Sequence, residues 1–238
     1  MNYSAVIVAA GSGTRMKLGY NKAYFRLDER TILEHTMDIF LSDPDCCEIV
    51  VVTDSETFRK EIPGRIPGRV VLVSGGPSRE ESVSNGLNAV TSEVVFVHDG
   101  ARPYLSRTCL EKMKQAMETE EAACLMVPCK DTIKVVQNGY IVKTIERNTI
   151  QAAQTPQAFR TELLVHCMDL ARKEGYQGTD DCSMVEHFSS AKIRAVPGSY
   201  ENFKITTPED LKRQAAGSFS EQVQTRRSGS CDGCGPDS

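Results

Sequence analysis

Short apolar runs alternate along this chain with segments whose apolar residues recur at helical spacing. The runs are rich in Val and Ile and have the length of strands, at residues 5–10, 48–53, 70–74, 93–98 and 122–128. They are apolar on both faces, which is typical of strands covered by helices on either side. The pattern therefore predicts an α/β protein with a mostly parallel sheet and helices on both of its faces.

The segments between the runs carry signals for helix starts. Thr31 and Glu34 form a capping-box string, which predicts the start of a helix of about ten residues. Thr207 and Pro208 are placed as the N-cap and first residue of a last helix. Further helices are expected at 82–90, 108–117, 161–174 and 180–188. In such a sheet, ligands bind beyond the carboxyl ends of the strands.

One segment departs from the alternation of strands and helices. Residues 131–146 read as two β runs around Asn138-Gly139, a dipeptide typical of tight hairpins. We therefore expect a protruding β-arm at about 130–155. Isolated hairpins are only marginally stable in water, so the arm should pack on something. A second subunit, giving a homodimer, is the favoured partner, and an extension of the chain's own sheet is the alternative.

Composition narrows the class of protein. The chain has 238 residues, is 40% hydrophobic and 25% charged, and has a formal net charge of −4. One domain spanning 1–217 is expected, and the charge argues against broad binding to nucleic acid or a membrane surface. No apolar run approaches the ~18 residues of a membrane span. Because a core strand begins where a signal peptide would lie, we expect a cytoplasmic protein.

Nine cysteines are spread along the sequence. Several lie in predicted strands or helices, Cys109 and Cys124 among them, so we expect buried thiols in a reducing compartment. Cys231 and Cys234 form a Cys-x-x-Cys pair, but a structural zinc site needs about four ligands and no second pair lies nearby. Residues 218–238 are expected to be a disordered tail, and a metal or redox site between molecules is the alternative.

The loop after the first apolar run is the strongest candidate for chemistry. Gly11 and Gly13 let the backbone approach a ligand, and N–H groups in such loops hold phosphate oxygens. Arg15 and Lys22 add two positive charges. The dinucleotide fingerprint fails because Met16 occupies the third glycine position, and no P-loop string occurs. A plain tight turn is the alternative, but the two cations favour phosphate binding.

Other polar residues follow the later runs. Asp99 and Arg102 come after a buried run, where a carboxylate can bind a ribose hydroxyl or a divalent ion and an Arg can clamp a phosphate. A surface ion pair is the alternative. Thr132 and Arg147 flank the arm, and antiparallel strands should bring them to the same end.

Three further candidates are weaker. Gly76 leads to Ser82 in a Gly-rich turn, which is also consistent with a loop closing onto a helix. Thr179 lies in a segment that could be only a helix N-cap, and Lys204 more often reads as a solvated charge on a short strand. No Ser nucleophile elbow is present, and the four His residues lack metal-ligand spacing.

Nine short strings stand in order along the chain. They are AAGSGTRM from Ala9, NKAYF from Asn21, GG with Arg79 and SV from Gly75, VHDGARP from Val97, KDTIK from Lys130, ERN from Glu146, AQTPQAF from Ala153, TDD from Thr179 and NFKITTPEDL from Asn202. Together, from about residue 3 to about residue 215, they resemble the 2-C-methyl-D-erythritol 4-phosphate cytidylyltransferase family. This resemblance implies a Rossmann-like nucleotidyltransferase fold whose β-arm clasps a second subunit.

The resemblance also assigns roles to matching residues. Arg15 and Lys22 match the catalytic pair that stabilises charge on the triphosphate. The implied cradle for the nucleotide is Ala9, Ala10, Gly11, Gly13, Gly76 and Ser82. The implied contacts to the sugar phosphate are Asp99, Arg102, Thr132, Arg147, Thr179 and Lys204, with Thr132 and Arg147 lent by the neighbouring subunit. Pro77-Ser78 departs from the polar or acidic residues expected there, which affects base recognition.

The implied reaction is cytidylyl transfer from CTP to 2-C-methyl-D-erythritol 4-phosphate in non-mevalonate isoprenoid biosynthesis. Mg²⁺ or another divalent cation is implied, held mainly by phosphates, with Asp99 as a candidate ligand. Two alternatives stay open: a cytidylyltransferase for another polyol phosphate such as ribitol 5-phosphate, and a catalytically silent nucleotide-binding protein. Arg15 and Lys22 speak against the silent protein, and the strings at Lys130 and Thr179 favour methylerythritol phosphate.

Overall fold

A seven-stranded sheet forms the centre of the protein in the computed structural model, which describes residues 1–11, 20–64 and 66–211. From edge to edge the strands are β3 (Val70–Val73), β2 (Cys46–Val52), β1 (Tyr3–Val8), β4 (Val94–Asp99), β8 (Gln151–Arg160), β5 (Ala122–Pro128) and β9 (Ile193–Pro197). Neighbouring strands are parallel except where β8 runs antiparallel to β4 and β5. The predicted α/β class with a mostly parallel sheet is confirmed.

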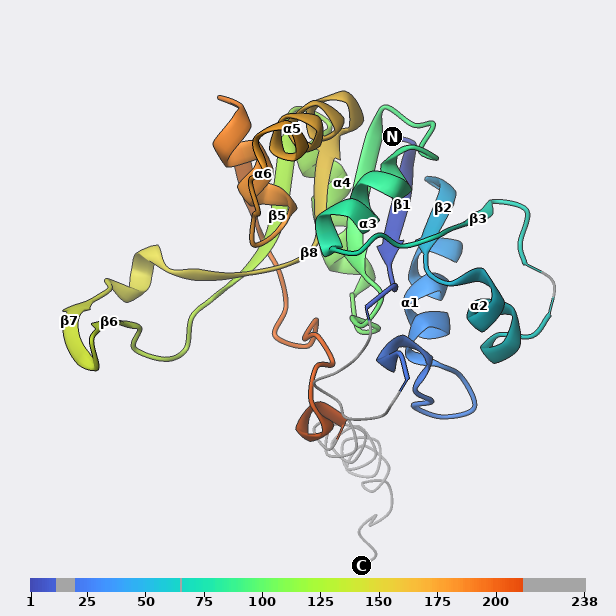
Figure 1. Cartoon of the computed structure of the whole chain (residues 1–238), viewed down its shortest axis with the longest axis horizontal. Helices are drawn as coiled ribbons and strands as arrows, with labels where there is room; N and C mark the ends of the chain where they lie inside the picture. The colour runs from blue at the N-terminus through green and yellow to red at the C-terminus, as the bar shows by residue number, and fades with distance from the viewer. Residues whose placement is uncertain (12–19, 65, 212–238) are drawn as a thin grey trace, which may run out of the picture.

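Helices cover both faces of this sheet (Figure 1). On one face lie α1 (Ile32–Leu41), α2 (Ser55–Glu61) and α4 (Arg107–Met117), and on the other lie α3 (Arg79–Leu87), α5 (Thr161–Glu174) and α6 (Asp181–Phe188). In β1, Ala5 and Ile7 belong to the core under the first set, while Val6 belongs to the core under the second. Successive side chains of a strand point to opposite faces, so a strand buried on both sides reads as a continuous apolar run.

Local hydrogen bonds explain where the helices begin. At α1 the predicted capping box is present, with the Thr31 hydroxyl accepting from the Glu34 N–H and the Glu34 carboxylate accepting from the Thr31 N–H. Ser78 caps α3 in the same way, so α3 begins at Arg79, three residues before the expected start. The last helix begins at residue 208, as predicted.

The sequence did not predict β8, β9 or α2. In β8 the buried positions include polar side chains at Gln154, Thr155 and Gln157, which hide the strand from an apolar pattern. Their polar atoms are paired instead, since Gln157 Nε2 donates to Asp180 Oδ2 at 2.7 Å and Gln154 Nε2 donates to the Ser199 carbonyl at 2.8 Å. Because β8 begins at Gln151, the end of the range expected for the arm belongs to the main sheet.

The predicted hairpin is present as β6 (Lys134–Gln137) paired with β7 (Tyr140–Thr144). Its turn has positive φ at both central residues, 50° at Asn138 and 84° at Gly139, which is the geometry that this dipeptide favours. The hairpin projects from the body of the protein, followed by a 3₁₀ turn at Arg147–Thr149 (Figure 1). All five residues of β7 are exposed, so this strand is accessible to solvent or to a binding partner.

Within the described residues no helix is long and apolar enough to span a membrane. The cysteines there are free thiols. Cys109, Cys124 and Cys167 are buried as expected, whereas Cys129, which also lies in an apolar stretch of the sequence, is only half-buried. Residues 218–238, with Cys231 and Cys234, lie outside the described residues.

Candidate active site

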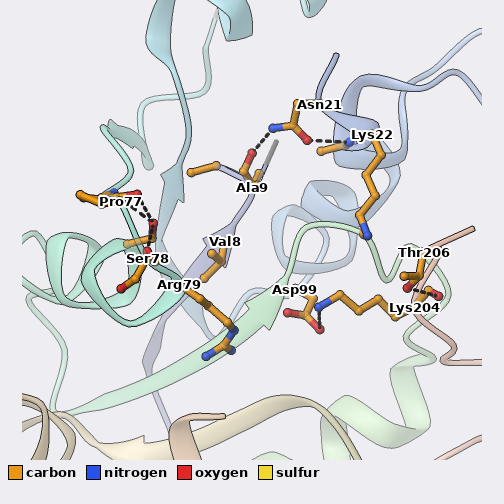
Figure 2. A pocket seen from close by; sticks show the side chains of 16 residues that line it. Val8, Ala9, Asn21, Lys22, Pro77, Ser78, Arg79, Asp99, Lys204 and Thr206 are labelled. Atoms are coloured by element: carbon orange, nitrogen blue, oxygen red, sulfur yellow. Dashed lines mark hydrogen bonds and ion pairs between the residues drawn. The ribbon is translucent and has the colours of Figure 1, made fainter. Parts of the chain in front are cut away.

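A cavity of about 420 Å³ opens beyond the carboxyl ends of β1 and β4, where open α/β sheets bind their ligands. Figure 2 shows its lining, with Lys22 and Arg79 on opposite sides and Asp99 between them. The structure gathers here many of the residues that the sequence singled out: Ala9, Ala10, Gly11, Lys22, Gly76, Ser82, Asp99 and Lys204. Gly13 and Arg15 lie outside the described residues.

The loops after β1 and β3 meet along one wall of the cavity. A Cβ atom on Gly75 would lie 2.3 Å from the Ala10 Cβ, so only glycine permits this approach. The Ser82 hydroxyl accepts from the Gly76 N–H at 3.0 Å and donates to the Ser78 carbonyl at 2.8 Å. Ser82 therefore fixes the shape of the loop, which is a second role beside the nucleotide contact that the resemblance implies.

Lys22 lies in a 3₁₀ turn at Lys22–Tyr24, and its side chain points into the cavity (Figure 2). Asn21 holds this turn, because its carboxamide oxygen accepts from the Ala23 N–H at 3.0 Å and its Nδ2 donates to the Ala9 carbonyl. The structure thus adds Asn21 to the site. Its position next to Lys22 in the NKAYF string was the available signal.

Asp99 is the carboxylate at the base of the cavity. Its Oδ2 lies 3.0 Å from Arg102 Nε and 3.1 Å from Lys204 Nζ. Burial opposes ionisation, but Lys204, Arg102 and Arg79 outweigh it and hold the pKa of Asp99 well below its usual range. Asp99 is therefore an anion at neutral pH. The alternative interpretation of Lys204 as a solvated charge on a short strand is wrong. Lys204 lies in a loop, and its ammonium group is paired with Asp99.

Arg102 lies behind Asp99 and does not line the cavity. Its Nη1 donates to the Asn202 carbonyl at 2.8 Å, which ties the loop after β4 to the segment that carries Lys204. The structure therefore joins Arg102 to the site through Asp99, and in this arrangement its guanidinium organises the carboxylate.

Two buried residues, His98 and Thr155, were absent from the predicted site but form a hydrogen-bond network with the backbone of Asp99 and Arg102. His98 Nε2 lies 3.1 Å from the Arg102 carbonyl, so that nitrogen carries the proton, and Nδ1 accepts from the Thr155 hydroxyl at 3.1 Å. The same hydroxyl accepts from the Asp99 N–H at 3.0 Å. Burial lowers the pKa of His98 to about 4, which keeps the ring neutral. Thr155 could not be paired with His98 from sequence, because the contact depends on β8 lying beside β4.

The remaining predicted residues lie away from this cavity. Arg147 Nη2 donates to the Thr132 hydroxyl at 2.8 Å at the root of the arm, so the hairpin brings these two together as expected. Both are exposed, and neither lines the cavity of its own chain. Thr179 is exposed just before α6, where its N–H donates to Ser183 Oγ at 3.0 Å.

The donor set at the cavity suits a magnesium ion that is held mostly by its substrate. Among the described residues no three His, Cys, Asp or Glu side chains cluster as a ready-made metal site. Asp99 is the carboxylate of the cavity lining. Mg²⁺ is commonly bound by one or two carboxylates together with substrate phosphates, so Asp99 fits this mode of binding.

Comparison with known proteins agrees with the geometry. Residues 3–217 match the family model described as 2-C-methyl-D-erythritol 4-phosphate cytidylyltransferase. A relative of that name from Bacillus velezensis is 40% identical over 236 residues, covering 96% of this chain and 98% of the relative. Another from Clostridioides difficile is 39% identical over 215 residues, covering 88% of this chain and 90% of the relative.

Solved structures show the same likeness. The crystal structure of 4-diphosphocytidyl-2C-methyl-D-erythritol synthase from Anaerococcus prevotii has a TM-score of 0.81 at 32% identity, covering 92% of this chain and 98% of that one. The cytidylyltransferase from Thermus thermophilus has a TM-score of 0.75 at 30% identity, covering 92% of this chain and 100% of that one. The chain therefore belongs to the 2-C-methyl-D-erythritol 4-phosphate cytidylyltransferase family.

Proposed function

We propose that the protein transfers the cytidylyl group of CTP to 2-C-methyl-D-erythritol 4-phosphate. The products are 4-diphosphocytidyl-2-C-methyl-D-erythritol and pyrophosphate, and the pathway is non-mevalonate isoprenoid biosynthesis. The single observation that carries the proposal is the cavity beyond β1 and β4, in which the glycine loops, Lys22, Asp99 and Lys204 face one space. The family membership supplies the substrates.

The reaction needs mainly positive charge around the phosphates of CTP and the acceptor. A phosphate oxygen of the acceptor attacks the α-phosphorus of CTP in line, the new O–P bond forms, and the bond to the β-phosphate oxygen breaks as pyrophosphate leaves. Two anions have to meet, so the barrier is largely electrostatic. Preorganised cations lower such a barrier, and we assign this role to Lys22 together with Arg15. Little proton transfer is needed, which agrees with the neutral, buried state of His98.

A divalent cation such as Mg²⁺ belongs to this proposal. Asp99 and the phosphate oxygens of CTP would hold it, and the bound ion supplies further neutralisation of the phosphate charge. The protein's own part is to keep Asp99 ionised, which Lys204, Arg102 and Arg79 do in spite of its burial.

The arm completes the site of a second subunit in this proposal. Its strands expose large apolar side chains, with 56% of Val136, 78% of Tyr140 and 66% of Ile141 accessible in the single chain. Such residues favour a protein surface over water. Thr132 and Arg147 at the root of the arm would then reach the acceptor phosphate in the partner's cavity, where the pair can bind it bidentately. Thr179 and Lys204 are proposed as further acceptor contacts.

The test is release of pyrophosphate from CTP by the purified full-length protein with Mg²⁺ and one acceptor at a time. We expect turnover with 2-C-methyl-D-erythritol 4-phosphate and little with ribitol 5-phosphate. A preference for ribitol 5-phosphate would favour the alternative polyol phosphate enzyme. No release with either acceptor, in a protein that still binds CTP, would favour a silent nucleotide-binding protein. The cytoplasmic location stays a prediction.

A further inference from the structure

One buried ion pair joins the N-termini of α3 and α6 beside the cavity, and its cation, Arg79, also contributes to the positive charge near Asp99. Arg79 is the first residue of α3 and Asp181 is the first residue of α6, 102 positions later in the sequence. The Nη1 and Nη2 atoms of Arg79 donate to Oδ1 and Oδ2 of Asp181 at 2.9 and 2.7 Å. Two parallel bonds of this kind fix orientation as well as distance.

The burial of this pair is uneven. The Asp181 side chain has 0% exposure, whereas Arg79 keeps 29% and lines the cavity. Dehydrating two charges offsets most of the attraction between them, so a buried pair contributes little net stability. What such a contact does provide is a fixed geometry between the elements that carry it.

Each partner is attached to a loop with a different task. Arg79 directly follows Ser78, which caps α3 and ends the loop of Gly75 and Gly76 on the nucleotide side. Asp181 follows Thr179 and the cap of α6, on the side assigned to the acceptor. The pair therefore links the segment proposed to bind the nucleotide to the segment proposed to bind the acceptor.

The Asp181 end of the contact is itself held firmly. Gln157 of β8 donates from Nε2 to Asp180 Oδ2 at 2.7 Å and accepts from the Cys182 N–H at 2.9 Å. Both hydrogen bonds tie the start of α6 to the central sheet. A rigid Asp181 can therefore set the position of Arg79, and through it the position of the nucleotide loop.

We propose that the Arg79–Asp181 pair acts as a strut. It fixes the position of the nucleotide loop relative to the acceptor loop. The inference rests on the proposed function. In-line transfer needs the two phosphates aligned, and a misplacement of about 1 Å can cost ~10²-fold in rate. Each substrate has its own contacts without the strut. Its loss therefore lowers kcat much more than it raises either KM, and the two residues are positioning residues.

The experiment compares Asp181→Asn, Arg79→Met and the double variant in the pyrophosphate-release assay. We expect each single change to lower kcat at least ~10-fold, with both KM values within about threefold of wild type. The double variant should be no slower than the worse single variant, because residues that act as one unit are not additive. The matched control is Arg194→Met, which breaks the ion pair between the exposed Arg194 and the half-buried Glu120, away from the cavity, and should leave kcat unchanged.

Besides unaffected variants, three results would overturn the strut. One is additive losses in the double variant. Another is a raised KM for CTP at normal kcat, which would make Arg79 a nucleotide ligand. The third is a lowered melting temperature with normal kinetics, which would make the pair purely structural. If Arg79→Met does not fold, Arg79→Lys replaces it, since it keeps the charge and loses the two-nitrogen fork. Absent turnover in the wild type counts against the proposed function, whereas normal wild-type turnover with unaffected variants counts against the strut alone.

Discussion

At the scale of single residues, the cavity works by holding charges that would otherwise be costly to bury. Asp99 is an anion because three cations surround it, and Lys204 and Arg102 contact it directly. Lys22 enters the same cavity from the 3₁₀ turn at Lys22–Tyr24. Acceptor and nucleotide are both anionic, so the described side chain whose removal should matter most is Lys22, the cation proposed to lower the electrostatic barrier.

Lys22→Ala should lower kcat by roughly 10²–10³ at saturating CTP, which is the cost of removing one preorganised charge from such a site. The melting temperature should stay within a few degrees of wild type, because Lys22 sits in a short turn at the edge of the cavity. Steady-state kinetics and thermal unfolding of the variant check both expectations. Lys60→Ala, at a highly exposed lysine of α2, is the control. A near-normal rate would remove Lys22 from the mechanism.

His98 makes the free energy of unfolding depend on pH in a direction that its pKa determines. Its pKa is about 4 in the fold against 6.5 when unfolded, so the native state resists the proton. The stability it contributes is complete above pH 6.5 and is lost as pH falls from 6.5 towards 4, a span of about 3 kcal/mol. In urea unfolding, the stability advantage of wild type over His98→Gln should shrink by this order between pH 7 and pH 4.

The control for this prediction is His166→Gln, at an exposed histidine of α5. Its stability difference from wild type is measured at the same two pH values, so that the pH-dependent part seen for His98→Gln can be compared with that of an exposed histidine. An NMR titration gives an independent check. A His98 ring that takes up its proton near pH 6.5 would contradict the neutral, doubly hydrogen-bonded state.

At the scale of elements, the apolar pattern predicted the strands that are buried on both faces and failed where burial is polar. β5 and α5 have the bounds expected from sequence. β8 was missed because Gln154 and Gln157 are buried through hydrogen bonds to distant segments, and a local pattern cannot reveal those partners. The hairpin was predictable because its turn depends on two adjacent residues alone.

The arm carries a prediction of its own. Arg147→Ala should raise KM for the acceptor several-fold more than KM for CTP, since in the proposed function the guanidinium and the neighbouring Thr132 hydroxyl bind the acceptor phosphate together. Both constants come from initial rates with one substrate varied at a time. Arg172→Ala, at an exposed arginine of α5, should change neither. Equal increases in both constants would count against an arm that reads the acceptor.

At the scale of the whole molecule, the site is only partly contained in contiguous sequence. Gly11 and Gly76 were identifiable because each lies in a glycine-containing loop after a predicted strand, whereas Ala9 and Ala10 were assigned to the site through the family resemblance. The pairs that organise the cavity join distant positions, as Asp99 does with Lys204 and Arg79 does with Asp181. Such pairs depend on the order of strands in the sheet, which the apolar pattern alone does not determine. The proposed role of Thr132 and Arg147 is harder still to predict from local sequence, because both residues lie outside the cavity of their own chain.

The exposed arm leads to a prediction about assembly. Ile141→Asp places a charge on an apolar strand that we expect to be covered by a second subunit, so it should shift the protein from dimer to monomer. Sedimentation velocity measures the mass directly. Gln115→Asp adds the same charge to an exposed position of α4 and should leave the dimer intact. A wild-type protein that sediments as a monomer would contradict the assignment of the arm to a partner.

The most direct measurement is a crystal structure of the full-length protein with CTP and Mg²⁺. The account predicts the cytidine against Gly76 and Ser82, and the triphosphate beside Lys22 with Asp99 facing the metal. A nucleotide bound elsewhere, or a cavity without nucleotide in which Lys22 points to bulk solvent, would contradict it.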